Sequence, residues 1–416
     1  MRNIFLIAAL FFALSFAGEG PVSYYGKLKV RAGMPFIDGI KEGREDIKLV
    51  QIRGVSFGWS NTGWESERFY NAAAVERVAI DWKAEVVRAA YGATSLAFTA
   101  SDAAANRSRI ETIVDAAIEN DVYVIIDWHS HSAQKETQQA TDFFSYMAQK
   151  YGSYDNVIFE LYNEPFCDEY DSNRNCTKKV TWAQIKDYAE AIIPIIRAHS
   201  SNLILVGTPN YSQKIEDVVA INDPNIGYVV HFYAASHSVS SWRDNMNKAL
   251  NAGLPIFVTE YGTTTADGGN PNAQDGNHYN SHNATRTDEW HTYMDSKRIS
   301  SVAWNINDKY EGSAFFGVVQ KGFDQSVPGN WSDTTQMTAS GKYIFKKLNE
   351  YYKTVPWNPN TSPIKSPEII NLPQTGEIFS LQGKKMGNSV LNLKSGTYIL
   401  LLRQGSQTKS IKFVKK

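Results

Sequence analysis

The sequence predicts an α/β protein built on a (β/α)8 barrel that is followed by a small all-β appendage. Short apolar runs rich in β-branched residues recur along the chain, and longer segments with helical patterns lie between them. Most of the runs lack strict apolar–polar alternation, as expected of strands that are buried on both faces. After Tyr352 the composition changes to a proline-rich stretch and then to alternating, glycine-punctuated segments.

Eight apolar runs are present, which is the number of strands in this barrel. They are "LVQIRGVSF" (49–57), "EVVRAAY" (85–91), "VYVIID" (122–127), "VIFELY" (157–162), "LILVG" (203–207), "YVVHFY" (228–233), "PIFVTEY" (255–261) and "SVAWNI" (301–306). Helical candidates include residues 65–82, 108–120, 182–200 and 340–352. The alternative is a doubly wound open sheet, whose usual work needs a glycine-rich phosphate turn after the first strand. The segment "RGVSFGWSN" is not such a turn, so the barrel is favoured.

The segments that flank the barrel have different compositions. Residues 1–17 combine a positive Arg2, an apolar run too short to span a bilayer comfortably and small residues before a cleavage point, which predicts a signal peptide. The alternative is a short membrane anchor. Residues 18–352 then form the predicted catalytic domain, which starts with a cap hairpin around "YYGKLKVRAG". We therefore expect a secreted or cell-surface protein.

The C-terminal part of the chain is predicted to be separate from the barrel. Residues 353–373 contain five prolines and are typical of a linker. Residues 374–416 contain alternating segments and glycine turns, which predicts β-hairpins. Residues 373–416 contain eight Lys and Arg and one acidic residue, a net charge of +7. Because the whole chain has a net charge of −1, the remaining residues carry −8. The tail is either a solvated charged surface or a separate functional module.

The overall composition limits the partners. The net charge of −1 gives no reason to expect nucleic acid. Aromatic residues make up 12% of the chain, with ten Trp and 22 Tyr, which suits a protein that stacks rings on flat ligands, although a bulky core explains any single one. Cys167 and Cys176 lie nine residues apart, and in an exported chain this spacing suggests one disulfide. The alternative is two free thiols.

Polar and aromatic residues stand at the ends of most of the predicted strands. They are Arg88, Asp127, His129, His131, Asn163, Glu164, His231, Tyr233, Glu260, Tyr261 and Trp304. In a (β/α)8 barrel the active site lies at the carboxyl ends of the strands. We therefore expect these side chains to converge on one rim.

Two glutamates dominate this predicted rim. Glu164 and Glu260 follow the fourth and seventh strands, so they face each other across the barrel mouth. Glycoside hydrolysis needs one carboxylic acid to protonate the leaving oxygen and one carboxylate to attack the anomeric carbon. Pro165 stiffens the backbone after Glu164, and the amide of Asn163 can donate to a sugar hydroxyl or to the partner carboxylate. Either glutamate alone would more simply be a surface carboxylate, but the pair predicts glycosidase chemistry.

The histidines suggest an alternative chemistry. "HSH" at 129–131 places two imidazoles two residues apart, as in metal-dependent amidohydrolases with barrel folds, which would use water activated by Zn²⁺. Those enzymes place the pair after the first strand and need further ligands after the fourth, where this chain has Asn-Glu-Pro. We therefore expect no metal and no cofactor, with His129 binding substrate and His131 in a loop.

Several of these segments together resemble a known family. "VVRAAYG", "YVIIDWHSH", "NVIFELYNEP", "GTPNYSQ", "HFYAASH", "IFVTEYGTT" and "AWNINDKYEGS" resemble, in order and spacing, the motifs of glycoside hydrolase family 5, and within it the bacterial endo-β-1,4-glucanases. The resemblance covers about residues 45 to 352. It implies a (β/α)8 barrel, a retaining mechanism and a β-1,4-glucan substrate.

The resemblance also implies roles for single residues. Glu164 matches the general acid/base and Glu260 the nucleophile, while Arg88 matches the arginine that keeps the nucleophile ionised. The other matched positions contact sugar or orient Glu260; they are His129, Asn163, His231, Tyr233, Trp304, Lys309 and Glu311.

The chain departs from the family pattern at three places in the expected cleft. Tyr211 stands where many such cellulases carry Trp, which predicts weaker stacking on the leaving-group side. The loop after the first strand lacks a histidine often found there, and Trp59 or Trp64 is a candidate to supply a platform instead. The cysteine-containing loop after Glu164 is longer than in compact relatives.

The tail has a resemblance of its own. "LKSGTYI" and the basic, strand-like end resemble the C-terminal sorting domain of the type IX secretion system, which implies the secretion machinery as a partner. The alternative is a small carbohydrate-binding module, but the tail has no Trp and only Tyr398 among tyrosines for a stacking strip.

The sequence therefore predicts a secreted, monomeric, retaining endo-β-1,4-glucanase. One alternative keeps the chemistry and changes the polymer to mannan, xyloglucan or mixed-linkage glucan. Another, from a different class, is a surface polysaccharide-binding protein without turnover.

Overall fold

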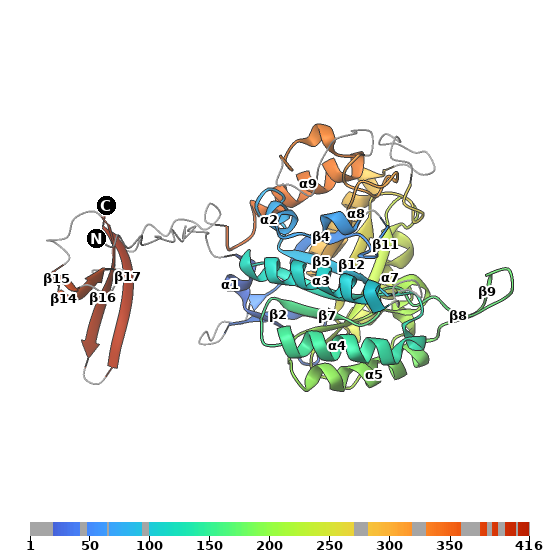
Figure 1. The fold of residues 1–416 in the computed structure, drawn as a ribbon, viewed down its shortest axis with the longest axis horizontal. Coiled ribbons are helices and arrows are strands. Elements are labelled where there is room, and N and C mark those ends of the chain that lie inside the picture. Colours follow the sequence, from blue (N-terminus) through green and yellow to red (C-terminus); the bar gives the residue numbers. More distant parts are fainter. Residues whose placement is uncertain are drawn as a thin grey trace, which may run out of the picture. The chain divides into compact units, whose positions relative to one another are not determined.

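Eight parallel strands close into a barrel in the computed structural model (Figure 1), which confirms the predicted fold class. The strand order is β10-β11-β12-β13-β4-β5-β6-β7, and β10 pairs with β7 to close the ring. These strands are β4 (Arg53–Phe57), β5 (Val86–Gly92), β6 (Tyr123–His129), β7 (Val157–Glu160), β10 (Ile204–Val206), β11 (Ile226–Tyr233), β12 (Ile256–Gly262) and β13 (Ser300–Ile306). Each of the eight runs predicted as strands overlaps one of them, with bounds that differ by at most a few residues.

The structure describes residues 20–41, 48–64, 66–93, 100–269, 282–317 and 330–358, together with four strands near the C-terminus. The predicted signal peptide (1–17) and most of the predicted linker (359–373) lie outside the described residues. The chain divides into two units, residues 1–358 and 359–416. The second unit contains an antiparallel sheet in the order β15-β14-β16-β17, made of β14 (Thr375–Ser380), β15 (Lys385–Ser389), β16 (Gly396–Gln404) and β17 (Gln407–Lys415).

Helices connect the barrel strands and cover them from outside (Figure 1). They are α2 (Ala72–Ile80), α3 (Ala100–Glu119), α4 (Thr137–Tyr151), α5 (Trp182–Arg197), α6 (Pro209–Ser212), α7 (Val239–Asn251), α8 (Ala284–Lys297) and α9 (Ala339–Tyr352). The pattern predicted as one helix over 65–82 is instead a 3₁₀ turn and the shorter α2, because the side chain of Asn71 accepts from the Ala74 amide and starts the helix there. In the part of the chain that the structure describes, none of the helices is long and apolar enough to cross a membrane.

The two ends of the barrel interior are filled differently. Side chains two residues apart on a strand share a face, so each strand contributes several residues to the interior. Near the amino ends of the strands the interior is apolar, with Val86, Ile125, Ile158, Leu205, Val229, Phe257 and Val302. Near the carboxyl ends it is charged and still buried, with Arg88, Asp127, Glu160 and Glu260.

An N-terminal cap packs on the apolar end of the barrel. It consists of α1 (Pro21–Tyr25), β1 (Lys27–Val30), β2 (Ile37–Ile40) and β3 (Lys48–Leu49), of which the three strands form an antiparallel sheet. Val22, Tyr25, Leu28 and Ile37 join the apolar cluster inside the barrel. Tyr24 and Tyr25 end a short helix instead of starting the hairpin, because Pro21 stands at its first turn.

Strand β12 contains a β-bulge at Thr259 and Glu260. Opposite β11, three residue steps from Phe257 to Glu260 match two steps from Val229 to His231. The same irregularity separates Val258 from Tyr261 opposite β13. A bulge adds one residue and re-aims side chains. Thr259 and Glu260, although consecutive, therefore both contribute to the interior of the barrel mouth.

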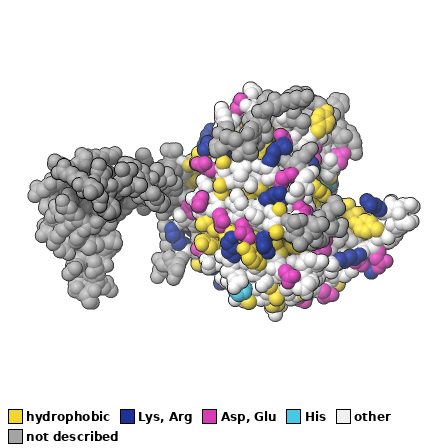
Figure 2. Space-filling view, viewed as in Figure 1, with side chains coloured by type: hydrophobic (Ala, Val, Ile, Leu, Met, Phe, Trp, Pro, Cys, Tyr) yellow, Lys and Arg dark blue, Asp and Glu magenta, His cyan; other side chains and the backbone are white. Residues whose placement is uncertain are grey.

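A hairpin follows Glu164 directly and extends from the barrel in Figure 1. It is made of β8 (Cys167–Tyr170) and β9 (Cys176–Lys179), and a disulfide joins Cys167 to Cys176. On the face shown in Figure 2, acidic and basic side chains of the described residues are intermixed, without an extended area of one sign. This distribution agrees with the net charge of −1 and with an uncharged binding partner.

Candidate active site

Arg88 is the centre of a buried group of charges at the barrel mouth. Its Nε and Nη2 donate to the two carboxylate oxygens of Glu160 at 2.8 and 3.2 Å. Its Nη1 donates to Glu260 at 3.0 Å, and Nη2 also reaches Asp127 at 2.9 Å and Asn163 at 2.7 Å. Arg88 is fully buried, so its cation depends on these carboxylates for compensation. One guanidinium therefore links strands β5, β6, β7 and β12.

The buried carboxylates beside Arg88 do not all ionise easily. Burial raises the pKa of Asp127 to about 7 and that of Glu160 to about 7, although Arg88 opposes both shifts. Asp127 accepts from Nδ1 of His129 at 2.6 Å, and burial together with the Arg88 charge lowers the pKa of His129. The imidazole of His129 is therefore held neutral, with Nε2 3.5 Å from the amide of Asn163.

Glu260 is fixed by two donors that keep their protons. Tyr233 donates to Oε1 at 2.8 Å and Arg88 to Oε2 at 3.0 Å. The pKa values of both donors are raised. Burial is the main cause for Tyr233, whereas for Arg88 burial opposes the shift and the neighbouring carboxylates outweigh it. Burial and the charge of Glu164 nevertheless raise the pKa of Glu260 to about 8, against the opposing effects of Arg88 and Tyr233.

Glu164 has imidazole neighbours in place of a guanidinium. Nδ1 of His231 lies 3.0 Å from Oε1, and Nε2 of His131 lies 3.3 Å from Oε2. Burial opposes ionisation of Glu164, but the contacts with His131 and His231 outweigh burial and lower the pKa of Glu164. The backbone is fixed as well, because the Glu164 amide donates to the Ser130 carbonyl at 3.2 Å.

The two glutamates form a coupled pair. Each has a carboxylate oxygen within 4.8 Å of the other and of a nitrogen of His231. Like charges at this distance do not both ionise readily, so the pair holds one proton more easily than none. The pKa directions given above put that proton on Glu260. The reverse arrangement, an anionic Glu260 beside a neutral Glu164, is favoured by the guanidinium and phenol donors at Glu260 and by a hydrogen bond from a neutral Glu164 to Nδ1 of His231.

A metal ion is the alternative occupant of this cluster. Among the described residues, Glu164, His231 and Glu260 form a group that could hold one. The two histidines of the "HSH" motif do not converge on a common point, because His129 is bonded to Asp127 and His131 reaches Glu164. His131 lies in a loop, as expected, but its contact with Glu164 was not predicted.

Aromatic side chains gather on the side of the mouth formed by β4 and β13, which are neighbours in the barrel. The Trp304 ring lies parallel to that of His129, with 5.3 Å between centroids. The Trp59 ring meets that of His129 edge-on, with 4.2 Å between centroids, and lies at 36° to the Trp64 ring, with 5.1 Å between centroids. Nζ of Lys309 lies 6.0 Å from the Trp64 ring.

The predicted contact residue Glu311 lies in the loop that follows β13. Its Oε1 accepts from the hydroxyl of Ser313 at 2.9 Å. It is therefore on the same side of the mouth as Trp304 and Lys309.

A second aromatic pair lies on the opposite side of the mouth, after β7 and β10. Tyr211 stacks on Phe166 at 4.0 Å with 15° between the rings. Asn210, Tyr211 and Ser212 all have φ between 56° and 61°, a left-handed turn without glycine. The turn holds the acid segment, since the Tyr211 amide donates to the Pro165 carbonyl at 2.9 Å and the Ser212 hydroxyl to the Asn163 carbonyl at 2.7 Å.

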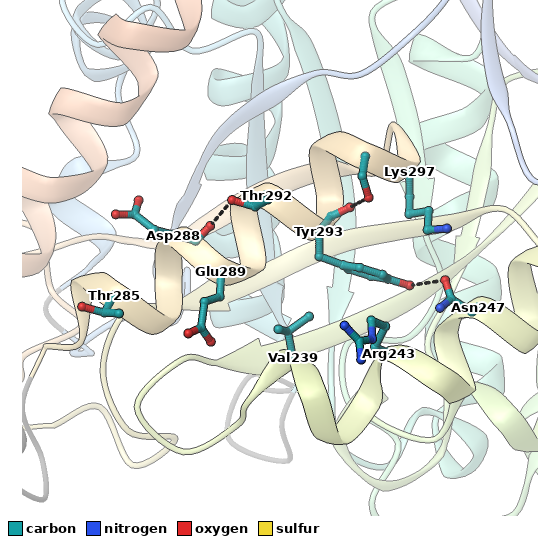
Figure 3. A pocket seen from close by; sticks show the side chains of 10 residues that line it. Val239, Arg243, Asn247, Thr285, Asp288, Glu289, Thr292, Tyr293 and Lys297 are labelled. Carbon is teal, nitrogen blue, oxygen red and sulfur yellow. Dashed lines mark hydrogen bonds between the residues drawn. The ribbon is translucent and has the colours of Figure 1, made fainter.

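A pocket of about 640 Å³ lies away from this site, between α7 and α8 (Figure 3). Tyr293 crosses it and donates to Asn247 at 3.2 Å. Its charged residues are of both signs and lie along the two helices, among them Arg243, Glu289 and Lys297. None of the residues predicted for catalysis or binding lines it. The barrel mouth, where coupled titratable groups converge, is therefore the candidate active site.

The structure brings the predicted site residues together at the barrel mouth, on strand ends and loops far apart in sequence. Sequence reasoning missed Glu160 and Thr259, which complete the buried hydrogen bonds of the cleft, and the contact made by His131. A signal for Glu160 is present, because a glutamate inside the buried run "VIFELY" needs a buried partner. Thr259 gives no such signal, since its position depends on the bulge in β12.

Comparisons with known proteins agree with this geometry. A family model described as cellulase (glycosyl hydrolase family 5) matches residues 43–310. Endoglucanase Z of Dickeya dadantii is 41% identical over 301 residues, which cover 71% of this chain and 62% of that protein. A cellulase of a Thermoanaerobacterium species is 34% identical over 81% of this chain and 84% of its own length. The chain thus spans less than two thirds of the length of the Dickeya relative.

Solved structures give the same result. A protein from Cytophaga hutchinsonii has a TM-score of 0.66 at 34% identity and covers 79% of this chain and 96% of its own. The catalytic domain of an endoglucanase from Thermobifida fusca has a TM-score of 0.63 at 28% identity and covers 79% of this chain and 99% of its own. A variant of that domain has been solved in complex with cellotetraose.

Proposed function

Because the chain belongs to glycosyl hydrolase family 5, we propose that it is a retaining endo-β-1,4-glucanase that cuts internal bonds of cellulose or related β-glucans. The observation that carries the proposal is the pair of glutamates, whose carboxylate oxygens approach within 4.8 Å. Retaining enzymes place their carboxyl groups at about 5–5.5 Å, whereas inverting enzymes leave room for a water at about 6.5–9.5 Å. The names of the relatives and the cellotetraose bound to one of them support the substrate class.

The first half of the reaction uses both glutamates. The Glu260 carboxylate attacks the anomeric carbon while Glu164 gives its proton to the departing glycosidic oxygen, which leaves a covalent glycosyl-enzyme. Arg88 and Tyr233 hold the attacking carboxylate by its two oxygens. Asn163 is fixed by Arg88 through its side-chain oxygen, and its NH₂ group, 3.5 Å from Nε2 of His129, has a second hydrogen for the sugar beside the bond that breaks.

The second half reverses the roles. Glu164, now a carboxylate, takes a proton from water, and the water attacks the anomeric carbon and releases Glu260. Two inversions at one carbon restore the β configuration. Because Glu164 alternates between acid and base, it needs neighbours that tolerate both forms, which imidazoles do.

The two aromatic sides of the mouth suit a chain of glucose units. Trp59, Trp64 and Trp304 offer ring faces on the β4–β13 side, where Lys309 and Glu311 add polar contacts. Tyr211 and Phe166 offer a stacked pair on the β7–β10 side. A polymer that crosses the mouth between them would place one bond over the glutamates. Cleavage inside the polymer follows from having platforms on both sides.

Export is part of the proposal. Residues 1–17 would direct the chain out of the cytoplasm, and residues 374–416 would engage a type IX secretion system as a sorting domain. The bonded Cys167 and Cys176 are consistent with an oxidising compartment.

Deletion of 374–416 should leave glucan hydrolysis intact and stop release from a host that has this secretion system. Loss of glucan binding in the deleted protein would instead favour a carbohydrate-binding module. We propose a monomer.

The activity is tested by reducing-end release from carboxymethylcellulose, mixed-linkage glucan, xyloglucan, mannan and xylan. We expect the β-1,4-glucans to be cut and a chelator to have no effect. Cleavage of mannan or xylan alone would keep the mechanism and replace the substrate. Binding without cleavage would favour a polysaccharide-binding protein. Loss of activity with chelator would favour metal-dependent hydrolysis.

A further inference from the structure

We propose that Thr259 and Glu160 are positioning residues that fix which nitrogen of His231 carries a proton and thereby keep Glu164 supplied with the proton it donates. The inference rests on the proposed function, in which Glu164 is the general acid. Neither residue touches the space above the glutamates. Both act through a chain of buried side chains that runs from Glu164 back to Arg88.

The chain is continuous in the structure. Nδ1 of His231 lies 3.0 Å from Oε1 of Glu164, and Nε2 of the same ring lies 2.9 Å from the hydroxyl oxygen of Thr259. That hydroxyl donates to Oε1 of Glu160 at 2.8 Å. His231 is 1% exposed, and Thr259 and Glu160 are fully buried, so water does not compete for these bonds.

The direction of each hydrogen bond follows from the Arg88 end. Burial raises the pKa of Glu160, but each of its two oxygens accepts a hydrogen bond from the guanidinium of Arg88, so neither oxygen is placed to carry a proton and the contacts are those of the ionised form. An ionised Glu160 offers no proton, so the Thr259 hydroxyl has to donate to it. The single hydrogen of Thr259 is then used, and its oxygen has to accept from Nε2–H of His231.

The consequence reaches Glu164. A neutral His231 that carries its hydrogen on Nε2 has a lone pair on Nδ1, which faces Glu164. That hydrogen bond needs a proton, and only Glu164 can provide it. The opposite tautomer would donate from Nδ1 to an ionised Glu164 and leave no proton for the leaving group. The Thr259–Glu160 pair excludes that tautomer, because an Nε2 without a hydrogen would place its lone pair against a lone pair of the Thr259 oxygen.

The bulge in β12 is what makes the arrangement possible. In a regular strand, consecutive residues point to opposite faces, so a strand that presents Glu260 to the cleft would turn Thr259 away. The extra residue in β12 lets both contribute to the barrel mouth. Arg88 therefore acts on both glutamates at once, directly on Glu260 and through Glu160, Thr259 and His231 on Glu164.

Other charged groups face this chain from the neighbouring strands and stay constant in the test. They are Arg88 from β5, Asp127 from β6, His131 from the loop after β6 and Glu260 from β12, and Glu160 of the chain itself lies 3.9 Å from His231.

The test compares Thr259→Val, which removes the hydroxyl at nearly the same size, with Thr259→Ser, which keeps it. Thr263→Val is the matched control, because Thr263 is also fully buried and donates to Ser340 at 2.8 Å outside the chain of bonds. Each variant is assayed for kcat/KM on cellotetraose and on 2,4-dinitrophenyl β-cellobioside. The aryl leaving group departs without protonation, so its hydrolysis does not report on the general acid.

We expect Thr259→Val to lose about tenfold or more in kcat/KM on cellotetraose and less than about twofold on the aryl glycoside, since a general acid contributes about 10²–10⁴-fold. Its alkaline pH limb should move to lower pH, because a His231 that is free to donate from Nδ1 stabilises ionised Glu164. Thr259→Ser should restore both properties. Equal losses on the two substrates, or a loss of the same size in Thr263→Val, would show a merely structural role and overturn the proposal.

A second measurement does not depend on activity. Nitrogen-15 NMR of histidine-labelled protein reports the tautomer of each imidazole. We expect Nε2–H for His231 in the wild type and a mixture or Nδ1–H in Thr259→Val. Nδ1–H in the wild type would overturn the inference even in an active enzyme. The expected tautomers in a protein that hydrolyses no glucan would uphold the hydrogen-bond chain and refute the proposed function alone.

Discussion

The surroundings of Glu260 and Glu164 differ although the two side chains are identical. Glu260 is bonded by a guanidinium and a phenol, both of which hold their protons at neutral pH, and its side chain is 6% exposed. Glu164 is bonded by two imidazoles and its side chain is 15% exposed. The first set of neighbours suits a carboxylate that stays ionised until it forms a covalent bond. The second suits one that gains and loses a proton in every turnover.

This difference shows that role is assigned by neighbours. Both glutamates lie near strand ends of one barrel, so it is the hydrogen-bonding neighbours, and not the side chains themselves, that make one the nucleophile and the other the acid. Substitutions that remove one glutamate, or alter one set of neighbours, should therefore give unequal and diagnostic effects.

The largest effect is expected from Glu260→Ala. Without the nucleophile no glycosyl-enzyme forms, and kcat on cellotetraose should fall by at least about 10⁴-fold, as is found when a covalent catalyst is removed. Added azide should occupy the vacated space and restore turnover of 2,4-dinitrophenyl β-cellobioside, with α-cellobiosyl azide as product. The configuration is read by proton NMR. A β product would contradict the assignment of Glu260.

Glu164→Ala should remove the general acid and leave the nucleophile in place. We expect a loss of about 10³-fold in kcat/KM on cellotetraose and a much smaller one on the aryl glycoside, because only the former needs an acid. Azide should again accelerate the variant, but with β-cellobiosyl azide as product, since Glu260 still forms the intermediate. Equal losses on both substrates would argue against a general acid at this position.

Arg88→Lys should affect Glu260 more than Glu164. A lysine keeps one positive charge but loses the fork of donors that joins Glu260, Glu160 and Asp127. We expect kcat/KM to fall by about 10²-fold and the acidic limb of the pH profile to move to higher pH. The sign follows because a weaker cation beside Glu260 raises the pKa of that carboxyl further. An acidic limb that does not move would show that Arg88 has only a structural role.

His131→Gln should have the smallest effect, and of the two glutamates it should act on Glu164. The side chain of His131 is 40% exposed, and its hydrogen bond to Glu164 favours the ionised form. Its loss should raise the pKa of Glu164 and move the alkaline limb to higher pH by about one unit or less, with kcat within about threefold. His199→Gln, at an exposed position, is the control. A shift to lower pH would contradict the contact seen here.

Much of this comparison could be predicted from the sequence. Buried parallel strands are continuous apolar runs, so the barrel and the ends of its strands could be located. The ends of strands carry the site, so Glu164, Glu260 and Arg88 could be placed on one rim. Which strand ends face each other across the mouth follows from the order of the eight strands in the closed barrel.

The residues that were missed depend on finer geometry. Thr259 faces the mouth because β12 has one extra residue, and sequence periodicity does not show where a bulge occurs. Glu160 lies in a run that looks apolar, and its purpose becomes clear only when Arg88 is seen beside it. His131 reaches Glu164 from a loop whose path is set by β6 and the turn after it.

The left-handed turn at Asn210–Ser212 restricts which sequences this cleft accepts. With φ near 60° at three consecutive positions, the backbone disfavours β-branched residues and tolerates Asn, Asp, His or Gly better. A saturation library at position 211 should therefore yield few folded clones with Val, Ile or Thr, whatever their affinity for glucan. Few single substitutions at these positions are therefore compatible with folding on the leaving-group side of the mouth. Wider changes require the turn itself to be rebuilt.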